Sequence, residues 1–174
     1  GPDAYQTPDG PRPFATRQEV IRVRWGDPVT MTVRETRHGP VISDLDAPRG
    51  RGDGTVLAIA MANLAPRDSA AAGLLALNAA GSIGAAREAA RLISSPAQNL
   101  MVADAEGNIA LYLTGRVPIR RSGDGSLPVA GWDGRADWDG FVAFDALPHI
   151  ENPASNLLAN ANNRVAPAGH AAYL

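Results

Sequence analysis

Residues 157–163 read LLANANN, a short apolar run that leads directly into three asparagines, Asn160, Asn162 and Asn163. In an extended strand, Asn160 and Asn162 would project to one face of a sheet and Asn163 to the other. Asparagine is depleted in strands, and a buried amide without partners costs about 1–3 kcal/mol, so the run needs a reason. Two interpretations are open at this point. The amides bond to nearby backbone at a strand end, or a neutral NH2 donor faces charge that develops on a reacting carbonyl oxygen.

The composition is that of a globular protein and excludes several classes of function. The 174 residues, 45% of them hydrophobic, are enough for one domain with a core. Sixteen basic and eighteen acidic residues give a net charge of −2 without a dense basic run, so nucleic acid is not an expected partner. The absence of cysteine excludes disulfides, thiol catalysis and cysteine-based metal sites.

The chain shows no membrane-spanning or export segment of its own. No apolar stretch approaches the roughly 20 residues that cross a bilayer, so no membrane partner is expected. The chain opens with Gly1-Pro2-Asp3, without an initiating Met, a basic region or an apolar signal region. An opening Gly-Pro can be the scar of a protease cut, and we expect the chain to be a piece of a longer protein.

The first third of the chain predicts strands and turns. Residues 1–18 are rich in Pro and Gly and predict an irregular lead-in. Strands are expected at 19–25, 29–36 and 55–62, with a short strand after the bend at 37–42 and a glycine-rich loop at 48–54. The loop runs into a strand and lacks a Gly-Lys-Ser/Thr end, so it is not a phosphate loop, and its Arg51-Gly52-Asp53 tripeptide is interpreted as a plain turn.

The middle of the chain predicts two helices followed by a hairpin. The alanine-rich stretches 69–80 and 82–93 predict short helices, the first capped by Asp68 or Ser69 and the second by Ser82. A hairpin is expected over 98–114, because two apolar runs flank Asp, Gly and Asn turn residues. Residues 116–148 are expected to be mostly loop, which is uncommon unless the loop is functional or packs on another part of the protein.

Several residues invite a site but have plainer interpretations. His38, beside Gly39-Pro40, is interpreted as a bonded, buried imidazole rather than a base. Asp133, Asp137 and Asp139 lack the spacing of an EF-hand and are interpreted as solvated loop carboxylates rather than calcium ligands.

The tryptophans leave a different class of function open. Trp25, Trp132 and Trp138 could hold a ligand by stacking, which would make the chain a non-catalytic binding module. Trp132 and Trp138 could instead pack a long loop onto the core.

A series of short motifs, taken in order and spacing, carries a family resemblance over nearly the whole chain, with 1–18 and 43–55 matching least well. The motifs are Arg37-x-Gly39-Pro40-Val41, Gln98-Asn99…Ala103-Asp104-x-x-Gly107-Asn108-Ile109, Gly115-x-Val117-Pro118-x-Arg120, Pro128-Val129-x-Gly131-Trp132, Trp138-x-Gly140, Leu147-Pro148, Asn152-Pro153 and Asn160-x-Asn162-Asn163. The chain resembles the penicillin acylase (penicillin amidase) family of N-terminal-nucleophile hydrolases, as an internal segment of the large subunit.

The resemblance implies a fold and a mechanism. The implied fold is α+β, an antiparallel sheet with two short helices on one face, as a single partial domain (1–174) of an αββα sandwich. Family members are precursors that cut themselves to expose a serine, whose own α-amino group is the base in the attack on an amide. Carried onto this sequence, Asn162 is the side-chain oxyanion donor near a strand end. The serine, the backbone oxyanion donor and an arginine near the site are expected outside the chain, which should be inactive by itself.

The resemblance also implies substrate residues, partners and a location. Leu74 and Gln98 are the expected substrate-binding residues in the acyl pocket, and the substrate is a small-molecule acyl amide. No cofactor is expected, although the parent enzyme can carry a structural calcium whose main ligands lie elsewhere. The partners are the remaining parts of the parent acylase, in the periplasm or secreted, and the separated chain is expected to self-associate. Besides the binding module, an inactivated acylase relative that acts as a scaffold remains an alternative.

Overall fold

The computed structural model describes residues 3–45, 54–166 and 169–170. The predicted loop at 48–54, including Arg51-Gly52-Asp53, therefore lies outside the described residues apart from Gly54. The chain divides into two compact units, one made of residues 1–61 and 125–137 and the other of residues 62–124 and 138–174.

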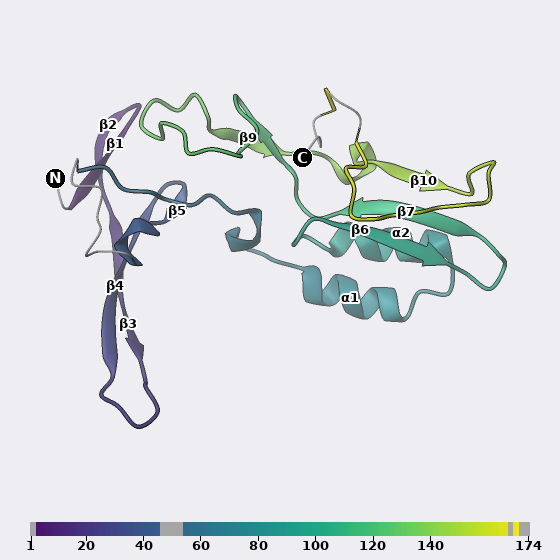
Figure 1. Ribbon diagram of the computed structural model, residues 1–174, viewed down its shortest axis with the longest axis horizontal. Coiled ribbons are helices and arrows are strands. Elements are labelled where there is room, and N and C mark those ends of the chain that lie inside the picture. Colours follow the sequence, from purple (N-terminus) through teal and green to yellow (C-terminus); the bar gives the residue numbers. More distant parts are fainter. Residues whose placement is uncertain (1–2, 46–53, 167–168, 171–174) are drawn as a thin grey trace. The chain divides into compact units, whose positions relative to one another are not determined.

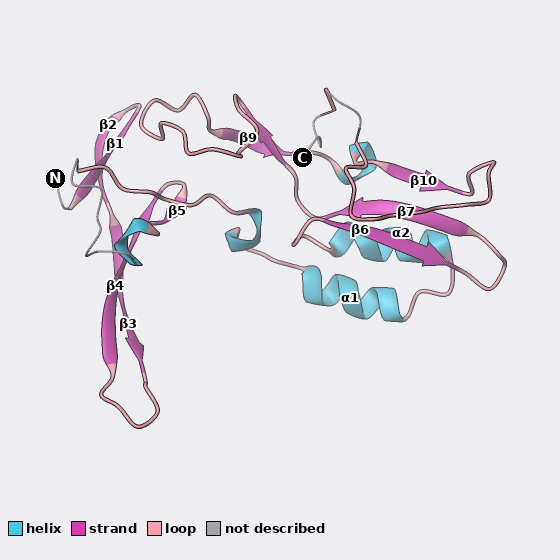
Figure 2. Cartoon of the chain, in the orientation of Figure 1, coloured by secondary structure: helices cyan, strands magenta, loops and turns pink. Residues whose placement is uncertain are grey.

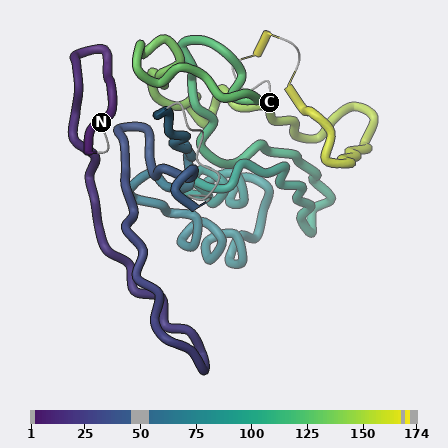
Figure 3. The backbone as a smooth tube through the Cα atoms, turned by 60° about the vertical axis from the view of Figure 1, so that its left-hand side comes forward, coloured from purple at the N-terminus to yellow at the C-terminus, as the bar shows by residue number. Residues whose placement is uncertain are grey.

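The first unit is built from hairpins. Strands β1 (Ala4–Thr7) and β2 (Gly10–Pro13) pair with each other, and β3 (Ala15–Ile21) pairs along its whole length with β4 (Val29–Thr36), as Figures 1 and 3 show. The irregular lead-in expected for 1–18 was wrong. Gly10, at φ 105°, lets the chain turn, and a two-stranded ribbon tolerates prolines because its outer edge needs no N–H donors.

Two other predicted strands of this unit differ from the structure. The strand expected at 19–25 begins at Ala15 and ends at Ile21, and Trp25 lies in the following loop with φ 65°. The strand expected at 55–62 is absent among the described residues, where Ala58 makes only an isolated bridge to Val41. Strand β5 (Gly39–Pro40), which pairs with β4, is only two residues long, because Pro40 has no N–H with which to extend a ladder.

The second unit contains the helices and a three-stranded antiparallel sheet in the order β10 (His149–Glu151), β7 (Ile109–Thr114), β6 (Gln98–Ala103). Helix α2 (Ile83–Leu92) packs on β6 and β7, and α1 (Ala70–Asn78) packs on α2 (Figures 1 and 2). Both predicted helices and the predicted hairpin are confirmed.

Local capping explains where the helices begin. The Ser82 hydroxyl accepts a hydrogen bond from the Ala85 N–H at 3.2 Å, as a capping serine should. At α1 the capping oxygen belongs to Asp68, whose Oδ1 accepts from the Ala70 N–H at 3.0 Å, while Ser69 makes no cap bond of its own.

The segment predicted to be mostly loop contains short elements that complete a small core. Strand β8 (Pro118–Arg120) pairs with β9 (Trp138–Phe141), and a 3-10 helix, η3, spans Phe144–Ala146. The core is the buried cluster of Leu113, Val117 and Leu147, against which Val142, Phe144 and Val165 pack.

Every strand pairing in the described residues is antiparallel, and with two helices this confirms the α+β class. None of the helices in the described ranges has the length and apolar character that a bilayer crossing requires.

Candidate functional site

The asparagine-rich segment forms a loop, not the predicted strand. Strand β10 ends at Glu151, and the chain then turns through Asn152 and Asn156, which have positive φ angles of 42° and 51°. No ladder covers residues 157–163. The strand prediction failed because asparagine side chains bond to the neighbouring backbone and so favour turns over sheet pairing.

The loop is organised by hydrogen bonds from its own amides. Asn160 Oδ1 accepts from the Asn162 N–H at 2.9 Å, and Asn163 Oδ1 accepts from the Ala161 N–H at 3.2 Å. Asn163 Nδ2 also donates to the Arg164 carbonyl at 3.2 Å. The first interpretation offered for the three asparagines is therefore correct for two of them, because the amides of Asn160 and Asn163 bond to nearby backbone.

Asn162 differs from its two neighbours. It is exposed, has φ 57°, and its carboxamide bonds to no other group in the described part of the chain. An amide in this state is a neutral NH2 donor available to a negative oxygen. Its role as an oxyanion donor stays a prediction.

The two predicted substrate residues lie on other elements of the same unit. Leu74 is on α1 with 54% of its surface exposed, and Gln98 is the exposed first residue of β6. The Gln98 backbone carbonyl accepts a hydrogen bond from the Thr114 hydroxyl at 3.2 Å, and the Gln98 side chain takes no part in this bond. No hydrogen bond among the described residues joins Leu74, Gln98 and Asn162 to one another, so the acyl pocket also stays a prediction.

A pocket of about 200 Å³ lies beside the core of the second unit, where the sequence predicted no site. Its lining includes none of the predicted site residues and consists of Ser69, Arg91, Ile93, Ser94, Gly115, Arg116, Val142, Phe144 and Leu147. Residues from so many separate segments meet only in the folded chain, so no local motif could have revealed it.

The serine in this pocket is not arranged as a nucleophile. The Ser94 hydroxyl donates to Asp68 and accepts from the Ser69 N–H at 3.0 Å. Hydrogen bonds from Ser94, Ala70 and Ser95 hold the pKa of Asp68 below its ordinary value, which makes that carboxylate a weak base. The Asp68–Ser94 pair therefore serves the local structure at the start of α1.

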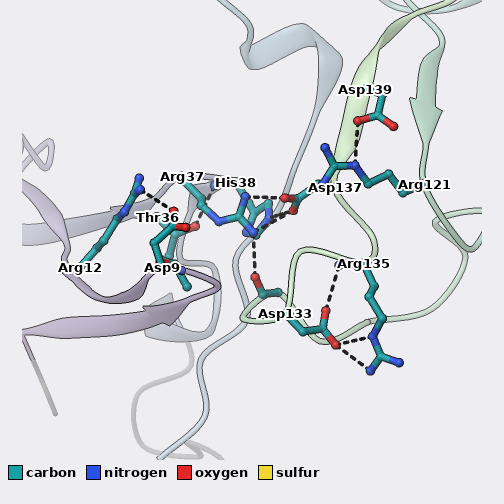
Figure 4. A network of polar contacts seen from close by, with 12 residues as sticks. Asp9, Arg12, Thr36, Arg37, His38, Arg121, Asp133, Arg135, Asp137 and Asp139 are labelled. Carbon is teal, nitrogen blue, oxygen red and sulfur yellow. Dashed lines mark hydrogen bonds and ion pairs between the residues drawn. The ribbon is translucent and has the colours of Figure 1, made fainter.

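The first unit contains a denser polar cluster around Asp137 (Figure 4). Arg37 donates to both carboxylate oxygens of Asp137 at 2.7 and 2.8 Å, and His38 Nε2 is hydrogen-bonded to Oδ1 at 2.9 Å. The bond from Arg37, aided by His38, lowers the pKa of Asp137 to about 2 against the opposing effect of burial. His38 is thus a bonded imidazole, as predicted, although its side chain is only partly buried.

The aspartates considered as calcium ligands all have cationic partners. Asp133 pairs with Arg135, Asp137 with Arg37, and Asp139 with Arg121. They are paired rather than merely solvated. Within the described ranges no group of three or more acidic or histidine side chains is placed to hold a metal ion, so no residue here is assigned to calcium.

The tryptophans lie on three different segments. Trp25 is 92% exposed in the β3–β4 loop, and Trp132 is 57% exposed in the loop before β9. Trp138 begins β9 and packs edge-on against Phe141, with 6.0 Å between ring centroids. Trp138 therefore packs within its own strand, and a ligand-holding role for the three tryptophans stays a prediction.

The chain matches one family model over its full length, residues 1–174, and that model describes penicillin amidase. Acyl-homoserine lactone acylase QuiP of Pseudomonas syringae pv. syringae (strain B728a) is 38% identical over 162 residues, which cover 93% of this chain and 19% of that protein. Penicillin acylase 2 proenzyme of Pseudomonas sp. (strain SE83) is 33% identical over 165 residues, covering 93% and 20%.

A solved structure agrees with these relatives. The thermostable penicillin G acylase from Alcaligenes faecalis superposes with a TM-score of 0.82 at 28% identity, covering 95% of this chain and 29% of that chain. The chain spans about a fifth of the length of the curated relatives it matches.

Proposed function

Because the chain belongs to the penicillin amidase family, we propose that it is part of an amidohydrolase that cleaves an acyl amide, with Asn162 as an oxyanion donor. The observation that carries the proposal is the state of Asn162, whose exposed carboxamide is left unbonded by the described residues while its neighbours bond to the loop. The names of the relatives support the reaction class, since they are acyl-homoserine lactone and penicillin acylases.

The proposed reaction uses a serine nucleophile from a part of the protein outside these 174 residues. The serine oxygen attacks the amide carbonyl carbon, and its proton passes to the free α-amino group of the same residue. The carbonyl oxygen becomes an oxyanion that accepts a hydrogen bond from Asn162 Nδ2. Collapse of this intermediate breaks the C–N bond, the amine leaves with a proton, and water later releases the acyl group.

Asn162 suits this role chemically because its amide is neutral and cannot titrate. Such a donor stabilises the transition state most when its position does not change during the reaction. The backbone bond from Asn162 to Asn160 supports a fixed position.

For the acyl pocket we propose Leu74 and Gln98 as wall residues. Leu74 and the adjacent Leu75 give α1 an exposed apolar surface suited to an acyl chain. Gln98 would add a polar group that suits a less aromatic acyl chain than phenylacetyl.

The test is Asn162→Ala in the full-length, processed enzyme, assayed with acyl-homoserine lactones and with penicillin G. We expect kcat to fall by about 100- to 1,000-fold with little change in KM, because the donor acts mainly on the transition state. A matched control is Asn78→Ala at the end of α1, another exposed asparagine, which should leave kcat within about twofold.

An Asn162→Ala enzyme with kcat close to that of the wild type would contradict the proposed role. The 174-residue chain assayed by itself provides the second arm. It should show no turnover, and turnover that Asn162→Ala abolishes would contradict placing the nucleophile outside the chain.

A further inference from the structure

The two asparagines that flank Asn162 hold the loop through crossed hydrogen bonds. Asn160 Oδ1 reaches forward two residues to the Asn162 N–H, at 2.9 Å, and Asn163 Oδ1 reaches back two residues to the Ala161 N–H, at 3.2 Å. Each bond closes a small ring of backbone and side chain, and together they overlap across Asn162. The backbone of Asn162 is therefore constrained from both sides.

The constraint matters because Asn162 has a left-handed backbone, at φ 57°. An asparagine tolerates this conformation better than most residues, but it remains the minority state of a free chain. A side-chain acceptor two residues earlier favours the turn that contains it. The left-handed backbone in turn determines the direction in which the Asn162 carboxamide leaves the loop.

The loop is also tied to the core of its unit. Asn163 Nδ2 donates to the Arg164 carbonyl. The next residue, Val165, packs against the cluster of Leu113, Val117 and Leu147, and Ala166 is buried. The crossed bonds therefore connect Asn162 to a packed part of the structure instead of to a free loop.

The two polar atoms of the Asn160 side chain differ in their hydrogen bonding. Its Oδ1 bonds to the Asn162 N–H, while its Nδ2 is buried and meets no acceptor among the described residues. A buried donor without a partner is unfavourable for folding. The Oδ1 hydrogen bond to the Asn162 N–H offsets this unfavourable burial.

We infer that Asn160 is a positioning residue for Asn162, with Asn163 as its counterpart on the other side. In the motif Asn160-x-Asn162-Asn163, the Asn162 carboxamide then faces the substrate, and the carboxamides of Asn160 and Asn163 hold the backbone of residues 161 and 162. This inference rests on the proposed function of Asn162 and adds to it the reason why three amides occur together.

The experiment compares four variants of the full-length processed enzyme: Asn160→Ala, Asn160→Ser, Asn162→Ala and the double variant Asn160→Ala/Asn162→Ala. Asn160→Ala should lower kcat by about fivefold to tenfold with KM nearly unchanged, the size expected for one lost hydrogen bond. Asn160→Ser should recover most of that loss, because a serine hydroxyl can accept from the N–H two residues on. Serine is preferred to aspartate, whose charge would itself repel an oxyanion.

The double variant separates positioning from an independent contribution. If Asn160 acts through Asn162, the double variant should be no slower than Asn162→Ala alone. Additive losses, an unchanged Asn160→Ala enzyme, or an Asn160→Ser enzyme as slow as Asn160→Ala would each overturn the inference.

Failure of the proposed function would look different. In that case Asn162→Ala would retain its kcat, whatever Asn160→Ala does. Circular dichroism and the melting temperature of each variant test whether unfolding causes a fall in kcat. A recovery of kcat in Asn160→Ser at an unchanged melting temperature would assign the effect to the lost hydrogen bond.

Discussion

At the scale of single residues, Asp137 shows how a long loop is held to a sheet. Its carboxylate receives both Arg37 bonds and the His38 contact across 100 and 99 residues of sequence. Arg37 also donates to the Gly131 carbonyl at 3.1 Å, and a Cβ on Gly131 would lie 3.2 Å from His38 Cε1. Arg37 and His38 therefore hold the loop that carries Gly131 and Asp137, and we call this group the Asp137 clamp.

We predict that Asp137→Asn lowers the free energy of unfolding by about 1–2 kcal/mol near neutral pH, because it removes a partly buried carboxylate that is paired with Arg37 and hydrogen-bonded to His38. The folded-state pKa of about 2 lies below the ordinary value of 3.8. The carboxylate therefore stabilises the fold above about pH 4, and this contribution disappears as the pH falls from about 4 to 2.

Urea unfolding at a series of pH values checks this. The difference between wild type and Asp137→Asn should be constant above about pH 5 and shrink below about pH 4. Asp139→Asn is the control, since its ion pair with Arg121 is half exposed and should contribute about 0.5 kcal/mol or less. A pH-independent difference for Asp137→Asn would show that the carboxylate charge is not what the clamp uses.

At the scale of elements, the two helices meet at a glycine. Gly73 is the buried residue of α1, and a Cβ there would lie 2.7 Å from the Ile93 side chain and 2.9 Å from the Ile93 backbone nitrogen. Glycine is otherwise a poor helix residue, so its presence reflects the close approach of α1 to the end of α2.

The same substitution should therefore have opposite effects on the two helices. Gly73→Ala is predicted to destabilise the protein by about 1–3 kcal/mol, because the added methyl group meets backbone atoms that cannot move away cheaply. A Cβ at Gly84 on α2 would make only an ordinary contact, 3.9 Å from Ser82 Oγ, so Gly84→Ala should stabilise by up to about 1 kcal/mol through helix propensity. Thermal and chemical unfolding of both variants measures the pair, and stabilisation by Gly73→Ala would refute the tight contact.

At the scale of the whole molecule, several large apolar side chains are exposed to water. Helix α1 has no charged residue, and Leu75 on it is 72% exposed. Leu127 and Leu157 are 75% and 71% exposed. A helix that is apolar on all sides is normally covered, and exposed apolar surface of this kind promotes association.

We expect the purified 174-residue chain to form dimers or larger species as its concentration rises. Light scattering across a concentration series measures this directly. The double variant Leu74→Glu/Leu75→Glu should shift the distribution toward monomer, because it places charge on the exposed side of α1. A wild-type chain that stays monomeric at high concentration would contradict the prediction.

The sequence by itself determined the helix pair, the β6–β7 hairpin and the family resemblance. The helix pair and the β6–β7 hairpin were predictable because their signals, capping residues and turn residues, act over a few positions. The order and spacing of the short motifs pointed to the penicillin amidase family, which the full-length match confirms. Asn162 was singled out in the same way, by its motif.

Only the tertiary structure decided how these parts are held. The Asp137 clamp and the pocket beside Ser94 depend on segments that lie far apart in the sequence and meet only after folding. The left-handed backbone of Asn162 likewise replaced the predicted strand. The physical reason is that side-chain amides and long-range ion pairs compete with the regular backbone ladder, and periodicity along one sequence does not record which of them wins.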